Sequence, residues 1–217
     1  MDVEIWSDIT CPWCYLGKRR FERALSQFEG AEPVNVTWRS YQLNPNQPKG
    51  DTRTHDEYLA EKTGRTIDEI RAGDARLTAL AAAEGLDYHF ERYRVVNTFD
   101  AHRVLHLARA VGVGAEAHER FMRGQLVEGE VMEDAETLVR LGGDVGLPGD
   151  AIRAVLDGDG YAADVRAEIR EAAALGCTGV PFFVIDRRYG VSGAQSAEVF
   201  LQVLQTVASE AAVSPRS

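Results

Sequence analysis

The sequence is poor in cysteine and has no long hydrophobic run. Three cysteines in 217 residues are too few, and odd in number, for the disulfide framework of a secreted domain, so they favour a reducing compartment. No apolar run approaches the roughly 20 residues that span a bilayer. The first residues, 1–5, have neither the basic nor the apolar part of a signal peptide. We therefore expect a cytoplasmic protein with no membrane partner.

Positive charge is also scarce. Lys and Arg number 24 against 34 Asp and Glu, which gives a formal net charge of −10. Nucleic acids and acidic membrane surfaces attract proteins through Lys and Arg, so neither is an expected partner. A chain of this length with 45% hydrophobic residues can bury a sizeable core. The oligomeric state is left open.

Strand patterns lie near both ends of the chain. Residues 3–6 form a short apolar strand, a helical pattern runs from Pro12 to Gly30, and residues 34–41 alternate as a second strand. A compact strand–helix–strand arrangement is typical of a right-handed βαβ unit. Near the other end, residues 180–185 form a strand, residues 191–193 its hairpin partner, and a last helix runs from Ser196 to about Glu210.

The middle of the chain is helical. Turn-forming residues at 44–51 mark a boundary, and apolar residues from 54 to 175 recur with a period near 3.6, interrupted by glycines. The order is therefore β-α-β, an all-helical insertion, then β-β-α. This order predicts an α/β fold in which one sheet is interrupted by the insertion.

The segment Cys11-Pro12-Trp13-Cys14 carries the chemistry. Proline fits the first turn of a helix, which puts Cys11 at the helix start and Cys14 one turn further, within reach of a disulfide if the geometry is right. A helix N-terminus favours the thiolate, which is the reactive species. Half of a zinc site is the rival interpretation. It requires two more ligands, and no second C-x-x-C or suitable Cys/His pair exists, so we predict thiol–disulfide chemistry and no metal.

A C-x-x-C beside a βαβ pattern indicates a thioredoxin-like redox motif. With Gly179-Val180-Pro181-Phe182-Phe183 late in the chain, the sequence resembles the DsbA family, and within it the cytosolic FrnE-like subgroup. The likeness covers nearly the whole chain. The other segments that match the subgroup are Ser7-Asp8, Leu43-Asn44-Pro45, Asn97-Thr98, Ala101-His102-Arg103 and Val191-Ser192-Gly193-Ala194-Gln195.

The resemblance implies a thioredoxin-like fold made of residues 1–50 and 176–217, with residues 51–175 as a helical insertion domain. It also implies that the Val180–Pro181 bond is cis and faces the two cysteines. Backbone groups beside such a bond stay free to pair with an extended substrate. An ordinary trans proline at the start of a strand is the alternative.

We expect a cytosolic dithiol–disulfide oxidoreductase of the protein disulfide oxidoreductase or isomerase type. Cys11, expected to be the more exposed thiol, attacks the substrate, and Cys14 resolves the mixed disulfide. The substrate is a disulfide or dithiol in a protein or a small molecule. No cofactor is expected, glutathione stays open as a co-substrate, and the redox partner is unknown. The expected substrate-binding residues are Pro12, Trp13, Val180 and Pro181.

Two other functions stay open. The 2-hydroxychromene-2-carboxylate isomerases and kappa-class glutathione transferases resemble this chain in architecture, but they have a serine at the position of Cys11 and activate the thiol of glutathione instead. The chain is alternatively a holdase that uses an apolar groove of the insertion. The two cysteines of the motif favour the oxidoreductase.

Several other polar residues have simpler interpretations. Cys177 is expected to be a small apolar residue that closes a helix rather than a third exchanging thiol. His102 and His106 have i,i+4 spacing but no third ligand, so we expect surface or packing residues. If the resemblance holds there, His102 and Arg103 line the cleft. Asn97 is expected to cap the helix that follows it.

Overall fold

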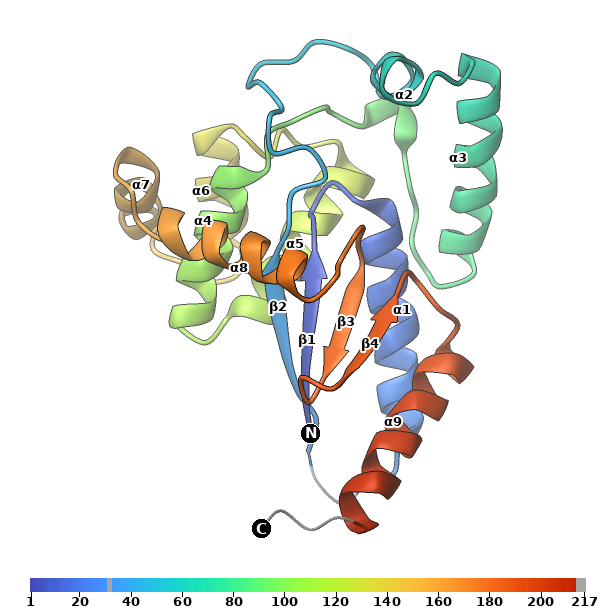
Figure 1. The fold of residues 1–217 in the computed structure, drawn as a ribbon. Coiled ribbons are helices and arrows are strands. Elements are labelled where there is room, and N and C mark those ends of the chain that lie inside the picture. The colour runs from blue at the N-terminus through green and yellow to red at the C-terminus, as the bar shows by residue number, and fades with distance from the viewer. Residues whose placement is uncertain (31–32, 214–217) are drawn as a thin grey trace.

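The computed structural model describes residues 1–30 and 33–213, and its centre is one four-stranded sheet (Figure 1). The strands are β1 (Asp2–Ser7), β2 (Asn35–Ser40), β3 (Phe182–Ile185) and β4 (Tyr189–Ser192). Their order is β2-β1-β3-β4, with β1 parallel to β2 and antiparallel to β3, and β3 antiparallel to β4. Helix α1 (Pro12–Gln27) connects the parallel pair, and α9 (Ala197–Val213) follows β4. The predicted β-α-β … β-β-α order is confirmed.

One face of the sheet packs against α1 and α9. Alternate residues of β1, Val3 and Ile5, are fully buried on this side. Phe183 of β3 lies between Phe21 of α1 and Phe200 of α9, with ring centroids 5.3 Å and 4.5 Å away. Such large buried rings dominate the stability of a core. This cluster fixes the position of α1 on the sheet.

The opposite face packs against α8 (Ala162–Ala174), which crosses the sheet in front of β1 and β2 in Figure 1. Trp6, the next residue along β1 after Ile5, points to this side because side chains alternate along a strand. Its indole nitrogen donates to the Glu168 carbonyl at 2.9 Å, and its ring packs with Cys177. The sheet is therefore covered on both faces.

Helices make up most of the chain between β2 and β3. Each of the first two begins with a capping box, in which a threonine and a glutamate three residues later satisfy each other's backbone N–H groups. The elements are α2 (His55–Thr63), α3 (Ile67–Ala82), the 3₁₀ turn η1 (Phe90–Arg92), α4 (Phe99–Ala110), α5 (Gly114–Arg123), the π-helical turn η2 (Gly124–Glu128), α6 (Ala135–Gly143), α7 (Gly149–Asp157) and α8. The division into domains at residues 51 and 176 stays a prediction.

Several element ends differ from the sequence prediction. Strand β4 (Tyr189–Ser192) begins two residues before the predicted 191–193 and ends one residue earlier. Helix α1 stops before Phe28, whose backbone is extended (φ −84°, ψ 113°), and so does not reach Gly30. Strand β3 begins at Phe182, because the preceding proline has no N–H for the ladder. Helix α9 runs past Glu210 to Val213, and residues 214–217 of the expected tail lie outside the described residues.

The Glu168 carboxylate joins α8, β2 and α4. One oxygen accepts from Arg39 and Arg109, both at 2.8 Å. The other accepts the Ser40 N–H at 2.7 Å and lies 3.1 Å from His106 Nε2. Although burial opposes the charge, these partners hold the pKa of Glu168 well below its ordinary value. The carboxylate is therefore ionised at neutral pH.

We predict that Glu168→Gln lowers the free energy of unfolding at pH 7 by about 3 kcal/mol, because it removes the buried carboxylate charge that Arg39 and Arg109 share. The pKa is lower in the folded than in the unfolded chain, so this contribution is complete above the ordinary glutamate pKa of about 4 and is lost as the pH falls below it. Denaturant titrations at several pH values measure the difference.

The matched control is Glu171→Gln on the same helix. Glu171 pairs with the half-exposed Arg187, and exposed ion pairs contribute less than about 1 kcal/mol. Equal losses in the two variants would contradict the assigned role of Glu168.

Candidate active site

Cys11 is the N-cap of α1. Its backbone is extended (φ −89°, ψ 109°), Pro12 follows as the first helical residue, and the Cys11 N–H donates to the Asp8 carbonyl at 3.0 Å. The helix therefore begins where the sequence predicts. Cys11, Cys14 and Cys177 are all free. Cys11 is 3% exposed and Cys14 0%, so the thiol expected to be exposed lies just below the surface.

The pairing of β1 with β3 brings the Val180–Pro181 segment to Cys11. Trp6 is paired with Phe182 in the antiparallel register, so the start of β3 lies beside the end of β1. The Cys11 thiol donates to the Val180 carbonyl, with sulfur and oxygen 3.6 Å apart. The Val180–Pro181 bond is cis. Residues 169 positions apart in the chain thus meet at one thiol.

Gly17 permits the close approach of Pro181 to α1. A Cβ added at Gly17 would lie 2.9 Å from Pro181 Cγ and 3.4 Å from Ala194 Cβ. Real Cβ atoms essentially never make the shorter of these contacts, and a proline ring cannot move aside like a flexible side chain. Glycine is therefore required where α1 passes the Pro181 segment.

Two tyrosines that the sequence analysis missed hold the backbone around Cys11. Tyr88 donates its hydroxyl to the Pro12 carbonyl at 2.6 Å, and Tyr93 donates to the Thr10 carbonyl at 2.8 Å. They flank η1, far from the motif in sequence. Burial raises the pKa of both phenols, so both stay protonated donors. No local pattern links them to the motif.

The Cys14 thiol is held as a protonated thiol. Burial, followed by the neighbouring Cys11, raises its pKa well above the ordinary value. The Asp8 backbone and the Ser7 side chain act in the opposite direction. Cys14 therefore reacts only when its proton is removed.

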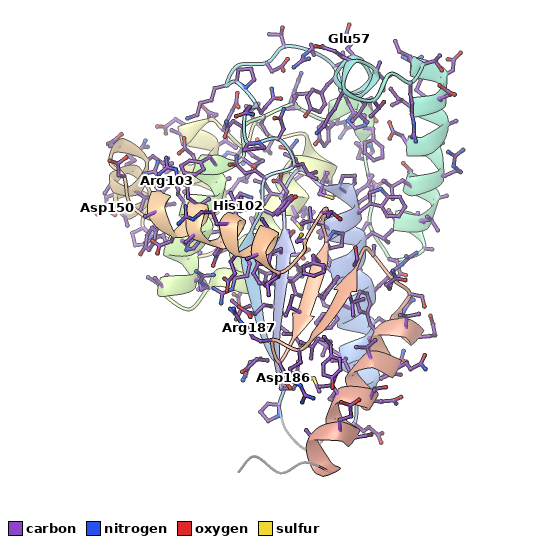
Figure 2. All side chains as sticks on the ribbon, in the orientation of Figure 1. Glu57, His102, Arg103, Asp150, Asp186 and Arg187 are labelled. Atoms are coloured by element: carbon purple, nitrogen blue, oxygen red, sulfur yellow. The ribbon has the colours of Figure 1, made fainter. Side chains whose placement is uncertain are left out.

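Asp8, which precedes Cys11 in the chain, and His102 of α4 are both buried, each 2% exposed. Asp8 Oδ2 accepts the Leu43 N–H at 2.8 Å, while Oδ1 lies 3.5 Å from His102 Nε2. Figure 2 shows His102 and Arg103 on α4. Arg103 turns away, donating to the Gly160 carbonyl at 2.9 Å. The expectation that Arg103 lines the cleft is therefore wrong.

His102 and His106 are both buried, which agrees with the packing alternative. His102 faces Asp8, and His106 faces Glu168. The two histidines, four residues apart, therefore contact two different carboxylates. Within residues 1–30 and 33–213, no three His, Cys, Asp or Glu side chains gather in a way that holds a metal ion. Thr98 is the N-cap of α4, so Asn97, one residue earlier, is not the cap that we expected; its side chain accepts the Phe99 N–H at 2.9 Å in an Asx turn.

The other predicted residues are distributed around the two thiols. Trp13 is 44% exposed and lines a pocket of about 370 Å³ with apolar residues of α2 and α3, namely Leu59, Ile70, Leu77 and Leu80. Cys177 packs in the apolar cluster around Trp6, and burial raises the pKa of its thiol, which agrees with a packing role. In the described ranges, no helix combines the length and apolarity needed to cross a bilayer.

The chain is similar to known proteins over its whole length. The model of the DSBA-like thioredoxin domain family matches residues 2–205. A crystal structure of a probable DsbA oxidoreductase from Streptomyces coelicolor is 47% identical, with a TM-score of 0.91 over 100% of this chain and 92% of that one. YwbO, an uncharacterized protein of Bacillus subtilis, is 26% identical over 91% of this chain and 92% of its own.

Two more distant structures share the fold. Cytosolic disulfide reductase DsbM from Pseudomonas aeruginosa, solved with GSH, is 21% identical with a TM-score of 0.64, covering 95% of this chain and 98% of that one. A 2-hydroxychromene-2-carboxylate isomerase is 15% identical with a TM-score of 0.71, covering 99% and 100%. The FrnE-like subgroup stays a prediction.

We predict that Gly17→Ala lowers the free energy of unfolding by about 1–3 kcal/mol, as overpacking does, and slows the reaction of Cys11 with a disulfide reagent. The reason is that the new methyl group displaces the Pro181 segment from α1. Gly73→Ala in α3 is the control, because its Cβ would meet only Arg76 Nη2, at 3.9 Å. That variant should be neutral or slightly more stable. A Gly17→Ala protein as stable and reactive as the wild type would contradict this packing.

Proposed function

The chain belongs to the family of DSBA-like thioredoxin domains, and from this premise we propose that it is a dithiol–disulfide oxidoreductase acting through Cys11 and Cys14. The observation that carries the proposal is the position of Cys11. It is the N-cap of α1, its sulfur lies 3.6 Å from the Val180 carbonyl, and Cys14 lies one turn deeper. A reactive thiol beside a backbone that can pair with an extended substrate is an arrangement suited to exchange.

The two thiols have different roles because their positions differ. The Cys11 thiolate attacks a substrate disulfide, forms a mixed disulfide and expels one substrate sulfur as a thiolate. The Cys14 thiolate then attacks the Cys11 sulfur, expels the second substrate sulfur and leaves a Cys11–Cys14 disulfide. The same steps in reverse oxidise a dithiol. Cys14 cannot act first, since it is fully buried.

The substrate is a disulfide or dithiol of a protein or a small molecule. Trp13 is the exposed apolar side chain between the two thiols, so it offers contact area to a substrate, together with its neighbours Pro12, Val180 and Pro181. Of the carbonyls of these three neighbours, that of Val180 lies beside Cys11, whereas those of Pro12 and Pro181 accept from the Tyr88 hydroxyl and the Gly193 N–H. Glutathione is a candidate co-substrate, which the GSH-bound structure of DsbM supports by analogy of fold. The chain has three cysteines, an odd number, which supports a reducing, cytoplasmic setting.

A glutathione-dependent isomerase or transferase is the second candidate, favoured by the shared fold of the 2-hydroxychromene-2-carboxylate isomerase. Enzymes of that class activate the glutathione thiol and have a serine at the position of Cys11. The cysteine pair therefore supports the oxidoreductase over this alternative.

We predict that the protein catalyses the reduction of insulin disulfides by a thiol reductant and that Cys11→Ser abolishes this catalysis. Turbidity from the released insulin chains measures the rate. Activity unchanged by Cys11→Ser would refute the proposal. Saturable glutathione binding that survives loss of both motif cysteines would instead support the isomerase or transferase.

We predict that Cys14→Ser accumulates a mixed disulfide on Cys11, because nothing remains to resolve it. Incubation with oxidised glutathione, followed by peptide mapping by mass spectrometry, locates the adduct. Cys177→Ser is the matched control and should behave as the wild type. Adducts on Cys177 would contradict the assigned roles.

A further inference from the structure

A cavity outside the thiol site lies along β2. It has a volume of about 330 Å³ and is enclosed by β2, α4 and the beginning of α5. Of the described residues that line it, none belongs to the Cys11–Cys14 motif or to the Val180–Pro181 segment. Binding sites for small molecules have volumes from about 300 Å³ upward. The cavity therefore has the size of a small-molecule site, and its walls are separate from the thiols.

The first turn of α5 lines this cavity and has backbone N–H groups without partners. Its first three residues are Gly114, Ala115 and Glu116, and all three line the cavity. The N-cap residue, Val113, has no side chain that could accept a hydrogen bond. Among the described residues, no group accepts from the N–H groups of the first three residues. A helix start of this kind attracts anions, because free N–H groups and the positive end of the helix dipole lie together.

Arg109 of α4 lies beside this helix start and lines the same cavity. A Cβ added at Gly114 would lie 3.1 Å from the Arg109 Cα, so the two segments are in contact. The Arg109 guanidinium donates from Nη1 to the Trp38 carbonyl at 3.2 Å and to Glu168 at 2.8 Å. Its Nε–H has no partner among the described residues. These bonds fix the guanidinium in place and leave it a donor for a ligand.

A buried imidazole without hydrogen-bond partners also lines the cavity. His118 lies one turn after Gly114 on the same side of α5, and its ring stacks on Trp38 with the centroids 4.0 Å apart. The side chain is 2% exposed, and in the described part of the chain neither ring nitrogen has a partner. Burial, followed by Lys18 and His102, lowers the pKa of His118, so the neutral ring has one N–H donor and one acceptor. Buried polar atoms are normally paired, which makes this ring an expected contact of a bound molecule.

Water is the alternative occupant, since a cavity of this size holds several molecules. The walls are not uniformly polar, however. Val36 and Leu105 line the cavity together with the polar groups, and an ordered water requires two to four polar partners. An organic molecule with one charged end and an apolar body matches both parts of the wall.

We propose that this cavity binds a small organic anion. A carboxylate or phosphate group of the ligand accepts hydrogen bonds from the N–H groups at the start of α5 and from Arg109. The apolar body of the ligand lies against Leu105 and Trp38, and His118 supplies a further hydrogen bond. The volume limits the ligand to a small molecule and excludes a peptide. No thiol takes part, so the site is independent of the proposed oxidoreductase function.

Isothermal titration calorimetry on the intact protein tests the proposal with benzoate, phenyl phosphate and benzamide. Benzamide has the shape of benzoate without its charge. We expect benzoate or phenyl phosphate to bind at one molecule per chain with a Kd of about 1 mM or lower. Benzamide should bind at least about tenfold more weakly, because hydrogen bonds to a charged group are stronger. The anion that binds more tightly shows whether a carboxylate or a phosphate is preferred.

His118→Phe separates binding from stability. Phenylalanine keeps a flat ring against Trp38 and removes both nitrogens. The affinity for the anion should fall about tenfold, the value of one hydrogen bond. The midpoint of thermal unfolding should stay the same or rise, because the variant no longer buries unpaired polar atoms. A purely structural histidine would leave the affinity unchanged.

Glu116→Gln tests the electrostatics of the same site in the opposite direction. Glu116 is exposed in the first turn of α5, and its negative charge opposes an anion there. Removing the charge should tighten binding about two- to fivefold. Glu198→Gln is the matched control, because Glu198 is exposed in the first turn of α9, outside the cavity. Its affinity should equal that of the wild type.

Amide NMR spectra locate the bound anion, and the signals of Gly114, Ala115 and Glu116 should shift most. Absence of binding by both anions at about 10 mM, or equal binding of benzamide and benzoate, would overturn the proposal. So would affinities that are unchanged in both His118→Phe and Glu116→Gln. Cys11→Ser should bind the anion like the wild type, which keeps a failure of this site distinct from a failure of the thiol chemistry.

Discussion

The pairing of β1 with β3 is the interaction on which the site depends. The register that joins Trp6 to Phe182 carries Val180 and Pro181 to the end of β1, where α1 begins. These strands are separated by all of the helices from α2 to α8. Closing a longer loop costs only slightly more free energy, so a large insertion is compatible with this pairing. Helices of the insertion then pack around the site. His102 of α4 lies 3.5 Å from Asp8, and residues of α3 line a pocket together with Trp13.

The features that the sequence predicted are those with a local physical cause. Pro12 predicts the start of α1, the alternation of Val3 and Ile5 predicts a strand with a buried face, and the C-x-x-C beside them predicts the fold. The contacts made by Tyr88, Tyr93 and Asp8 were not predictable in this way. They join segments far apart in the chain, and nothing in the spacing of a tyrosine or an aspartate indicates which carbonyl or imidazole it will meet.

The two buried carboxylates, Glu168 and Asp8, differ in how many of their oxygens have hydrogen-bond partners. Each oxygen of Glu168 has a hydrogen-bond partner, and these bonds join α8 to β2 and α4. Asp8 has one oxygen held and one free among the described residues. His102 and His106, one turn apart on α4, face these two carboxylates in turn. A fully satisfied network stabilises a fold, and the Asp8–His102 pair is the one that is only partly satisfied.

The central claim is that Cys11 and Cys14 cycle between dithiol and disulfide. Its most direct test is the reduction potential of the pair, measured by equilibrating the protein with glutathione redox buffers and trapping the free thiols. The account predicts reversible interconversion of these two cysteines alone, with a potential above about −300 mV, outside the range of structural disulfides. A pair that stays a dithiol in oxidised glutathione, or whose disulfide has a potential below that value, would contradict it.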